Sequence, residues 1–151
     1  MVEVETAKDL ASLIGQKIGT SEWIEIDQKM INAFADVTND PMWIHVDVER
    51  ASREMPDGKT IAHGLLVLSL VPGLAQTIYK VKRRSRALNY GLNRVRYTGQ
   101  VQVGSRVRTH QTIKAVDVIE GGARITSEHL VEIEGRSRPA LVAETLVVMY
   151  D

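Results

Sequence analysis

The 151-residue sequence contains no cysteine and no excess of charge of either sign. Without cysteine there is no disulfide, no thiolate nucleophile and no zinc–thiolate site. Lys and Arg together number 19, as do Asp and Glu, so the formal net charge is zero. A general nucleic-acid binder or a protein that binds anionic membranes usually carries a basic excess, so we predict neither partner. A small neutral chain also has little self-repulsion, which leaves self-association open.

The first ten residues lack the apolar run of a secretory signal, because they hold three acidic residues and one lysine. We therefore expect a cytoplasmic protein. The composition, 44% hydrophobic and 25% charged, is that of an ordinary soluble globular protein. A chain of this length can bury a core of its own, and no linker or repeat interrupts it. The expected organisation is one domain over residues 1–151.

The N-terminal third of the chain predicts short helices. Residues 7–14 place leucine and isoleucine at helical spacing. Asp27 is a good N-cap for a second helix, which Pro41 ends because the residue before a proline is driven out of the helical region. The apolar face of that second helix holds Met30, Ile31, Phe34 and Val37. Asp47 is expected to cap a further helix over residues 48–55.

Residues 61–79 form the most apolar stretch of the chain and leave almost no polar face. A helix of this kind is either buried or spans a membrane. The stretch is borderline in length for a bilayer, and polar residues interrupt it at His63, Ser69 and Gln76. We therefore expect a buried helix wrapped by sheet, with a kink at Pro72, whose ring removes one amide donor.

The C-terminal half of the chain predicts strands. Segments 86–97, 105–118, 123–134 and 139–150 are rich in Val, Ile, Thr and Tyr, and glycines separate them. The links are short, which predicts antiparallel neighbours because parallel pairs need long crossovers. The expected fold is therefore α+β, with one long central hydrophobic helix against a curved antiparallel sheet.

Asp40 and His45 lie five residues apart, directly after the second helix and with Pro41 between them. Histidine accepts and returns protons near neutral pH, and a carboxylate nearby can orient it or hold the same water. Two such groups can hold one water from two sides, as the addition of water to a double bond requires. Alternatively, Asp40 is a turn residue and His45 an ordinary core or surface residue, since Asp is common in turns.

Gly64 stands at the start of the apolar helix. The first amides of a helix have no intrahelical partners, and the helix dipole makes that end positive. A glycine lets a ligand carbonyl come close to these amides, so the Gly64 N–H is a candidate donor to an oxyanion. The alternative is that Gly64 only allows close packing of helix and sheet. His63 is expected to make a structural hydrogen bond at the entrance of the helix; the alternative is that it is a residue of the pocket.

A possible metal-ligand set and a basic run are two further features of the sequence. Asp40, His45 and His63 supply the donor types of a two-histidine, one-carboxylate iron site, but nothing in the sequence indicates its tight geometry, and we predict no metal. A basic run at residues 80–86 is expected to form a solvated loop. The alternative for this run is a site for the phosphates of a coenzyme A substrate, since Arg suits such contacts. His110 and His129 are expected at the surface, because their predicted strands also carry charged residues.

Taken together, these segments resemble a known family. The pattern Asp-x-x-x-x-His-x-Asp at 40–47, followed by Ala-His-Gly at 62–64 and a hydrophobic helix, is similar to the MaoC-like (R)-specific enoyl-CoA hydratases and dehydratases. Trp43-Ile44 before the histidine and the stretch 89–97 resemble the nodulation-protein-N-like branch of that family. The resemblance covers most of the chain.

The resemblance implies a hot-dog fold, a homodimer with continuous sheets, and (R)-specific hydration of trans-2-enoyl-CoA to 3-hydroxyacyl-CoA with the reverse dehydration. It implies that Asp40 and His45 are the catalytic pair and that the Gly64 amide binds the thioester carbonyl. No cofactor is implied, because coenzyme A enters only as part of the substrate. Met42 and Trp43 stand where the commoner pattern has Asn-Pro, so we expect an altered pocket wall beside the pair.

Two other functions stay open at this point. Hot-dog scaffolds also host thioester hydrolysis, because a fold does not determine chemistry, and water attacking the thioester carbonyl would use similar groups. A non-catalytic acyl-thioester-binding protein would keep the fold without turnover. The sequence also leaves open whether coenzyme A or an acyl carrier protein bears the acyl group.

Overall fold

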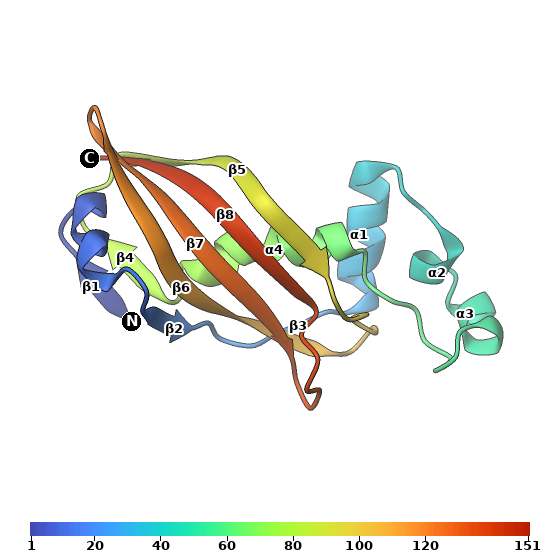
Figure 1. Cartoon of the computed structure of the whole chain (residues 1–151). Helices are drawn as coiled ribbons and strands as arrows, with labels where there is room; N and C mark the ends of the chain where they lie inside the picture. The colour runs from blue at the N-terminus through green and yellow to red at the C-terminus, as the bar shows by residue number, and fades with distance from the viewer.

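The computed structural model describes residues 1–151 and is dominated by one curved antiparallel sheet (Figure 1). Its strands run in the order β2-β6-β7-β8-β5, and β3 also pairs with β6. The bounds of these strands are Lys17–Thr20 (β2), Ile24–Glu25 (β3), Arg86–Tyr97 (β5), Arg106–Ile119 (β6), Gly122–Ile133 (β7) and Leu141–Tyr150 (β8). A separate parallel pair joins β1 (Val2–Val4) to β4 (Tyr79–Val81). The predicted α+β class is confirmed.

The four long strands lie where the sequence predicts them, but one predicted neighbour is wrong. Strand β5 pairs with β8 at the far edge of the sheet and not with β6, which follows it in the chain. The link between β5 and β6, residues 98–105, has eight residues and can reach about 26 Å when extended, enough to cross the curved sheet. A short link therefore excludes a parallel pair but does not require a hairpin.

Helix α4, Gly64–Ala75, lies along the concave face of the sheet (Figure 1). It is shorter than the predicted 61–79 segment, because Ile61 forms a β-bridge and Tyr79 already belongs to β4. Apolar residues suit helix and strand alike, so an apolar run does not reveal where its helix ends. The side of α4 away from the sheet is uncovered, and Leu65 is 59% exposed. The curved sheet therefore covers one side of the helix, and the opposite side is open.

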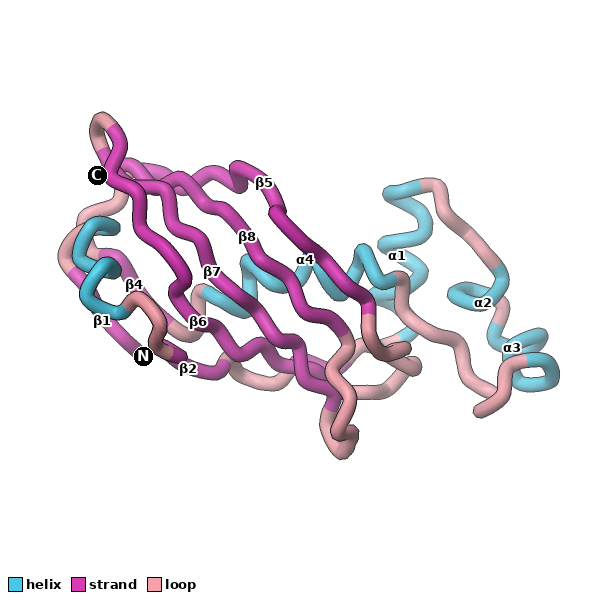
Figure 2. The backbone as a smooth tube through the Cα atoms, viewed as in Figure 1, coloured by secondary structure: helices cyan, strands magenta, loops and turns pink.

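Three short helices lie beyond the end of the sheet at which α4 begins (Figures 1 and 2). They are α1 (Gln28–Thr38), α2 (Trp43–Val46) and α3 (Val48–Glu54). Asp27 and Asp47 cap α1 and α3 as predicted, each accepting from the amide of the third helical residue at 2.8 and 2.9 Å. Val37 does not belong to the buried face of α1, since it is 81% exposed; Ile31 and Ala35 are the residues that α1 buries.

The core on the inner face of the sheet consists of two apolar clusters. The first contains thirteen buried residues, among them Ile31, Leu66 and Val131. The second contains nine, among them Leu10 and Ile113, and is covered by residues Ala7–Leu13, which form a 3-10 helix where an α-helix was predicted. Between the clusters, the inward-facing side chains of β6 and β7 are polar and at most 3% exposed. We call these four side chains the polar belt: Thr109, Gln111, Ser127 and His129.

The burial of His129 contradicts the prediction that it lies at the surface. Successive strand residues face opposite sides of a sheet, so the charged neighbours of His129 point outward while its ring points into the core. Burial lowers the pKa of His129 to about 4, and Nδ1 lies 3.3 Å from the Thr109 hydroxyl. His110 faces the other side, where it is half-buried and contacts Glu132 at 2.6 Å. No helix of the chain has the length and apolarity needed to cross a membrane.

Candidate active site

Asp40 and His45 are positioned by the end of α1 and by α2. Asn39 ends α1 in the left-handed conformation, with φ at 53°, a region that Asn tolerates better than most residues. The chain then turns, and the Asp40 amide donates back to the Ala35 carbonyl at 3.0 Å. After Pro41 the single turn of α2 carries His45, whose side chain is buried while that of Asp40 is exposed. The turn therefore presents the carboxylate from the solvent side and the imidazole from within.

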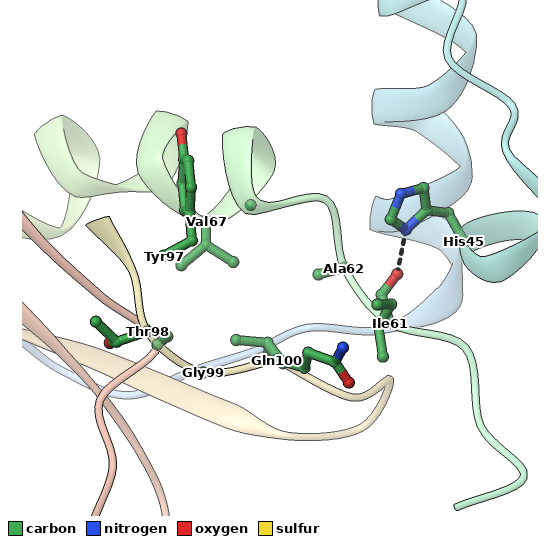
Figure 3. Close-up of a pocket in the computed structure, with 11 residues that line it drawn as sticks. His45, Ile61, Ala62, Val67, Tyr97, Thr98, Gly99 and Gln100 are labelled. Atoms are coloured by element: carbon green, nitrogen blue, oxygen red, sulfur yellow. Dashed lines mark hydrogen bonds between the residues drawn. The ribbon is translucent and has the colours of Figure 1, made fainter. Parts of the chain in front are cut away.

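The ring of His45 is held in one tautomer. Its Nδ1 lies 2.6 Å from the Ile61 carbonyl oxygen, which can only accept, so Nδ1 carries the hydrogen and Nε2 a lone pair (Figure 3). Burial lowers the pKa of His45, and the nearby His63 lowers it further, while the hydrogen bond to Ile61 and the charge of Asp40 oppose the shift. The imidazole is therefore neutral at pH 7 and able to accept a proton.

The structure brings Asp40, His45 and His63 together. A carboxylate oxygen of Asp40 and one ring nitrogen of each histidine all lie within 4.8 Å of one another. Groups at such a distance can share a water, because two hydrogen bonds of about 2.8 Å each span it. The arrangement can therefore hold a water between a carboxylate and a neutral imidazole.

His63 makes the structural hydrogen bond expected at the helix entrance. Its Nε2 donates to the Asp40 backbone carbonyl at 3.0 Å, which ties the start of α4 to the turn after α1. Its ring stacks on that of His45, with centroids 3.7 Å apart and planes inclined by 25°. A ring lone pair lies in the ring plane, so two stacked rings do not point at one ion. This geometry does not suit a shared metal, and the absence of a metal stays a prediction.

A glutamine that the sequence did not single out fixes His45 from the other side. The Nε2 of Gln28, in the first turn of α1, donates to the His45 carbonyl at 2.8 Å. Its Oε1 accepts from the Thr60 hydroxyl at 2.5 Å. Gln28 thus joins α1, α2 and the segment leading to α4, and it acts as a positioning residue for His45.

Gly64 and His45 line one cavity of about 250 Å³ (Figure 3). Gly64 is the first residue of α4, no side chain caps this end, and the Gly64 amide makes no hydrogen bond within the chain. The ring of Tyr97 lies against it, because a Cβ at position 64 would come within 2.7 Å of Tyr97 Cδ1. Gly64 therefore meets both descriptions given above: it allows close packing, and it leaves a free amide beside a cavity.

Several residues of the cavity wall were missed from the sequence. Tyr97 ends β5, and Thr98, Gly99 and Gln100 follow it in the link to β6. They reach the cavity only because that link crosses the sheet beside α4, which the predicted β5–β6 hairpin would have prevented. Met42 and Trp43, by contrast, do not line this cavity: Met42 is exposed, and the Arg50 guanidinium lies over Trp43 at 4.1 Å. The prediction that these two residues alter the wall of the pocket is therefore wrong for the cavity formed within one chain.

The basic run 80–86 lies at the opposite end of α4 from Gly64 (Figure 1). Part of it belongs to β4, and Lys82 pairs with Glu3 at 3.7 Å. The run is therefore partly strand and not simply a loop. Within one chain the run is remote from His45. Its position therefore does not support the alternative in which it binds the phosphates of a coenzyme A substrate whose acyl group lies at His45.

Comparison with known proteins assigns the family. A model described as the MaoC-like domain matches residues 9–134. The chain belongs to the MaoC-like family. One MaoC-like relative, 3-hydroxyacyl-thioester dehydratase Z of Mycobacterium tuberculosis (strain H37Rv), is 47% identical over 144 residues, which cover 95% of each chain. Nodulation protein N of Rhizobium leguminosarum bv. viciae is 43% identical and covers 93% of this chain and 89% of that one.

Solved structures bear out the fold of this MaoC-like chain. A monoamine oxidase regulatory protein from Archaeoglobus fulgius superposes with a TM-score of 0.79 at 24% identity, covering 100% of this chain and 99% of the other. The fold is the predicted hot-dog fold, and the predicted nodulation-protein-N-like branch is confirmed. As a MaoC-like protein the chain is an enzyme of the hydro-lyase class.

Proposed function

We propose that the chain catalyses (R)-specific hydration of trans-2-enoyl-CoA to 3-hydroxyacyl-CoA and the reverse dehydration. The observation that carries this proposal is the gathering of the Asp40 carboxylate and the His45 ring within 4.8 Å, beside a cavity that also holds the free Gly64 amide. A relative named 3-hydroxyacyl-thioester dehydratase supports a thioester substrate. The (R) configuration is carried over from the family resemblance.

In the proposed hydration, Asp40 and His45 hold one water between them. The Nε2 lone pair of His45 removes a proton while the water oxygen bonds to the β-carbon of the enoyl thioester. The electrons of the double bond move towards the thioester oxygen, where the Gly64 N–H stabilises the developing charge. The pair then returns one proton to the α-carbon. One water has been added in total and the pair is unchanged, so no separate cofactor is required in this proposal.

Variants of the pair test the proposal directly. Asp40→Asn and His45→Gln should each lower the rate of crotonyl-CoA hydration by about 10²-fold or more, the usual contribution of a general acid–base group. Asp47→Asn and His110→Gln are matched controls, since Asn also caps helices and His110 lies outside the cavity. Wild-type rates in both pair variants would overturn the assignment.

The assay also separates the two alternative functions. Loss of the enoyl absorbance of crotonyl-CoA reports hydration, whereas release of free coenzyme A thiol reports hydrolysis. A neutral imidazole beside a water could direct that water to the β-carbon, which gives hydration, or to the thioester carbonyl carbon, which gives hydrolysis. A thioesterase is therefore the second candidate. Saturable binding of several acyl-CoA chain lengths without either signal would instead identify a non-catalytic acyl-thioester-binding protein.

We further propose a homodimer in which β5 pairs with β5 of a second copy. β5 has twelve residues, forms one edge of the sheet, and exposes Leu88, Tyr90 and Leu92. A long, uncovered apolar edge offers a row of unpaired backbone groups to another strand. A two-fold axis would pair the edge with itself in antiparallel fashion and make the two sheets continuous.

The mass in solution tests this dimer. Leu92→Lys should convert the dimer to monomer, because a lysine on an edge strand opposes pairing. Leu130→Lys, on the central strand β7, is the control and should leave the dimer intact. Light scattering measures both, and a Leu92→Lys variant that keeps the dimer mass would contradict the proposed edge.

A further inference from the structure

A second cavity, of about 390 Å³, lies beside the C-terminal part of α4. Its walls include Pro72 and Ala75 of α4 and inward-facing residues of β6, β7 and β8. It shares no lining residue with the cavity at His45 and Gly64. The two cavities lie near opposite ends of α4, which is about 18 Å long, so the second is not part of the candidate active site.

The second cavity opens onto the polar belt. Gln111 and Ser127 both line it, and the Gln111 Nε2 donates to the Ser127 hydroxyl at 3.0 Å. The Gln111 Oε1, in a side chain only 2% exposed, has no hydrogen-bond partner. Native structures contain few buried acceptors of this kind, because leaving one unpaired is destabilising. Gln111 therefore offers an acceptor to a ligand that brings an N–H or O–H donor.

The same cavity is lined by cations and by no acidic residue. Lys80 and Arg84 contribute to its wall, and neither forms an ion pair within the chain, whereas the neighbouring Lys82 pairs with Glu3. Tyr79 also lines it; burial raises the pKa of the Tyr79 hydroxyl, while the charge of Arg84 opposes the shift. An arginine binds a carboxylate through two parallel hydrogen bonds, so Arg84 and Lys80 select an anion.

We propose that this second cavity binds a small organic acid that carries a hydroxyl group, of the 3-hydroxy acid type. The carboxylate contacts Arg84 and Lys80 at the rim, and the hydroxyl donates to the Gln111 Oε1 at the polar belt. Its volume is within the range of pockets that enclose small ligands. The site is separate from the thioester site and does not depend on the reaction proposed there.

Titration of the whole protein with (R)-3-hydroxybutyrate, followed by ligand-observed NMR, tests both contacts. We expect saturable binding in about the millimolar range. Butyrate, which lacks the hydroxyl, and 1,3-butanediol, which lacks the carboxylate, should each bind about tenfold more weakly. Equal affinity for 3-hydroxybutyrate and butyrate would overturn the role of Gln111, and no saturable binding of 3-hydroxybutyrate would overturn the site.

The affinities of four variants for 3-hydroxybutyrate show which cavity binds it. Arg84→Gln and Gln111→Met should each weaken 3-hydroxybutyrate binding about tenfold. Arg83→Gln, the adjacent arginine that does not line the cavity, and His45→Gln should leave the affinity unchanged. Binding lost in His45→Gln but kept in Arg84→Gln would locate the acid in the thioester site and overturn the proposal. If Gln111→Met does not fold, the comparison of Arg84→Gln with Arg83→Gln still decides it.

Discussion

Replacement of Gly64 by proline isolates the contribution of its amide. Gly64 is the first helical residue of α4, the position at which proline is best tolerated; the proline removes the N–H in question and adds its ring. His63 before it has φ −58° and ψ 135°, an extended conformation that a following proline accepts. The helix should therefore form in the Gly64→Pro variant.

The matched control is Gly64→Ala, which keeps the N–H and adds a Cβ at the same place. That Cβ would meet the Tyr97 ring at 2.7 Å, so both variants displace Tyr97 and should also be compared in a Tyr97→Ala background. Loss of one oxyanion donor costs about 10²–10³ in kcat, or about 3–4 kcal/mol. We expect Gly64→Pro to lie this far below Gly64→Ala in either background, measured as kcat for crotonyl-CoA hydration.

Equal kcat values for the two variants, with circular dichroism showing both to be folded, would refute a role of the Gly64 amide in stabilising the oxyanion. That result would assign Gly64 to packing against Tyr97 alone. If Gly64→Ala regains the full kcat in the Tyr97→Ala background, its loss of activity in the original background comes from the clash of its Cβ with the Tyr97 ring.

Two further predictions concern His129 and Gln28. Because the folded pKa of His129 is about 4 and its unfolded value about 6.5, the unfolded chain alone binds a proton between these values. The free energy of unfolding should therefore fall by about 3 kcal/mol as the pH is lowered from 6.5 to 4, and urea titrations of His129→Gln should lack this part of the slope. Gln28→Ala should lower kcat about tenfold with little change in KM, since it releases the His45 carbonyl. Asn32→Ala, which removes only the outer contact of Gln28, should keep the wild-type kcat in the same assay.

The sequence predicts best what depends on local chemistry. The caps at Asp27 and Asp47 and the limits of the four long strands follow from side-chain type and from periodicity of two, and all are present. Their arrangement in space was harder to predict. The partner of β5 depends on the curvature of the whole sheet, and the residues of the link 98–105 do not indicate that curvature.

The candidate site divides in the same way. Asp40, His45 and Gly64 were predicted because their residue types and spacing suit acid–base and oxyanion chemistry. The structure brings Asp40 close to His45, and it places His45 and Gly64 on one cavity, which Asp40 does not line. Gln28 and Tyr97 were missed because each acts through a contact more than fifteen residues away in the chain. His129 was misplaced because its charged neighbours describe the outer face of the strand and not the inner one.

The polar belt has a consequence for how this fold tolerates change. It separates the apolar cluster beneath α1 and the start of α4 from the one beneath the N-terminal 3-10 helix. Side chains in different clusters share no apolar contact, so their substitutions should act additively on stability. The apolar cluster beneath the N-terminal 3-10 helix can then be repacked to raise thermal stability without moving His45 or Gly64. The candidate active site and the stability of the chain can, in this sense, be altered separately.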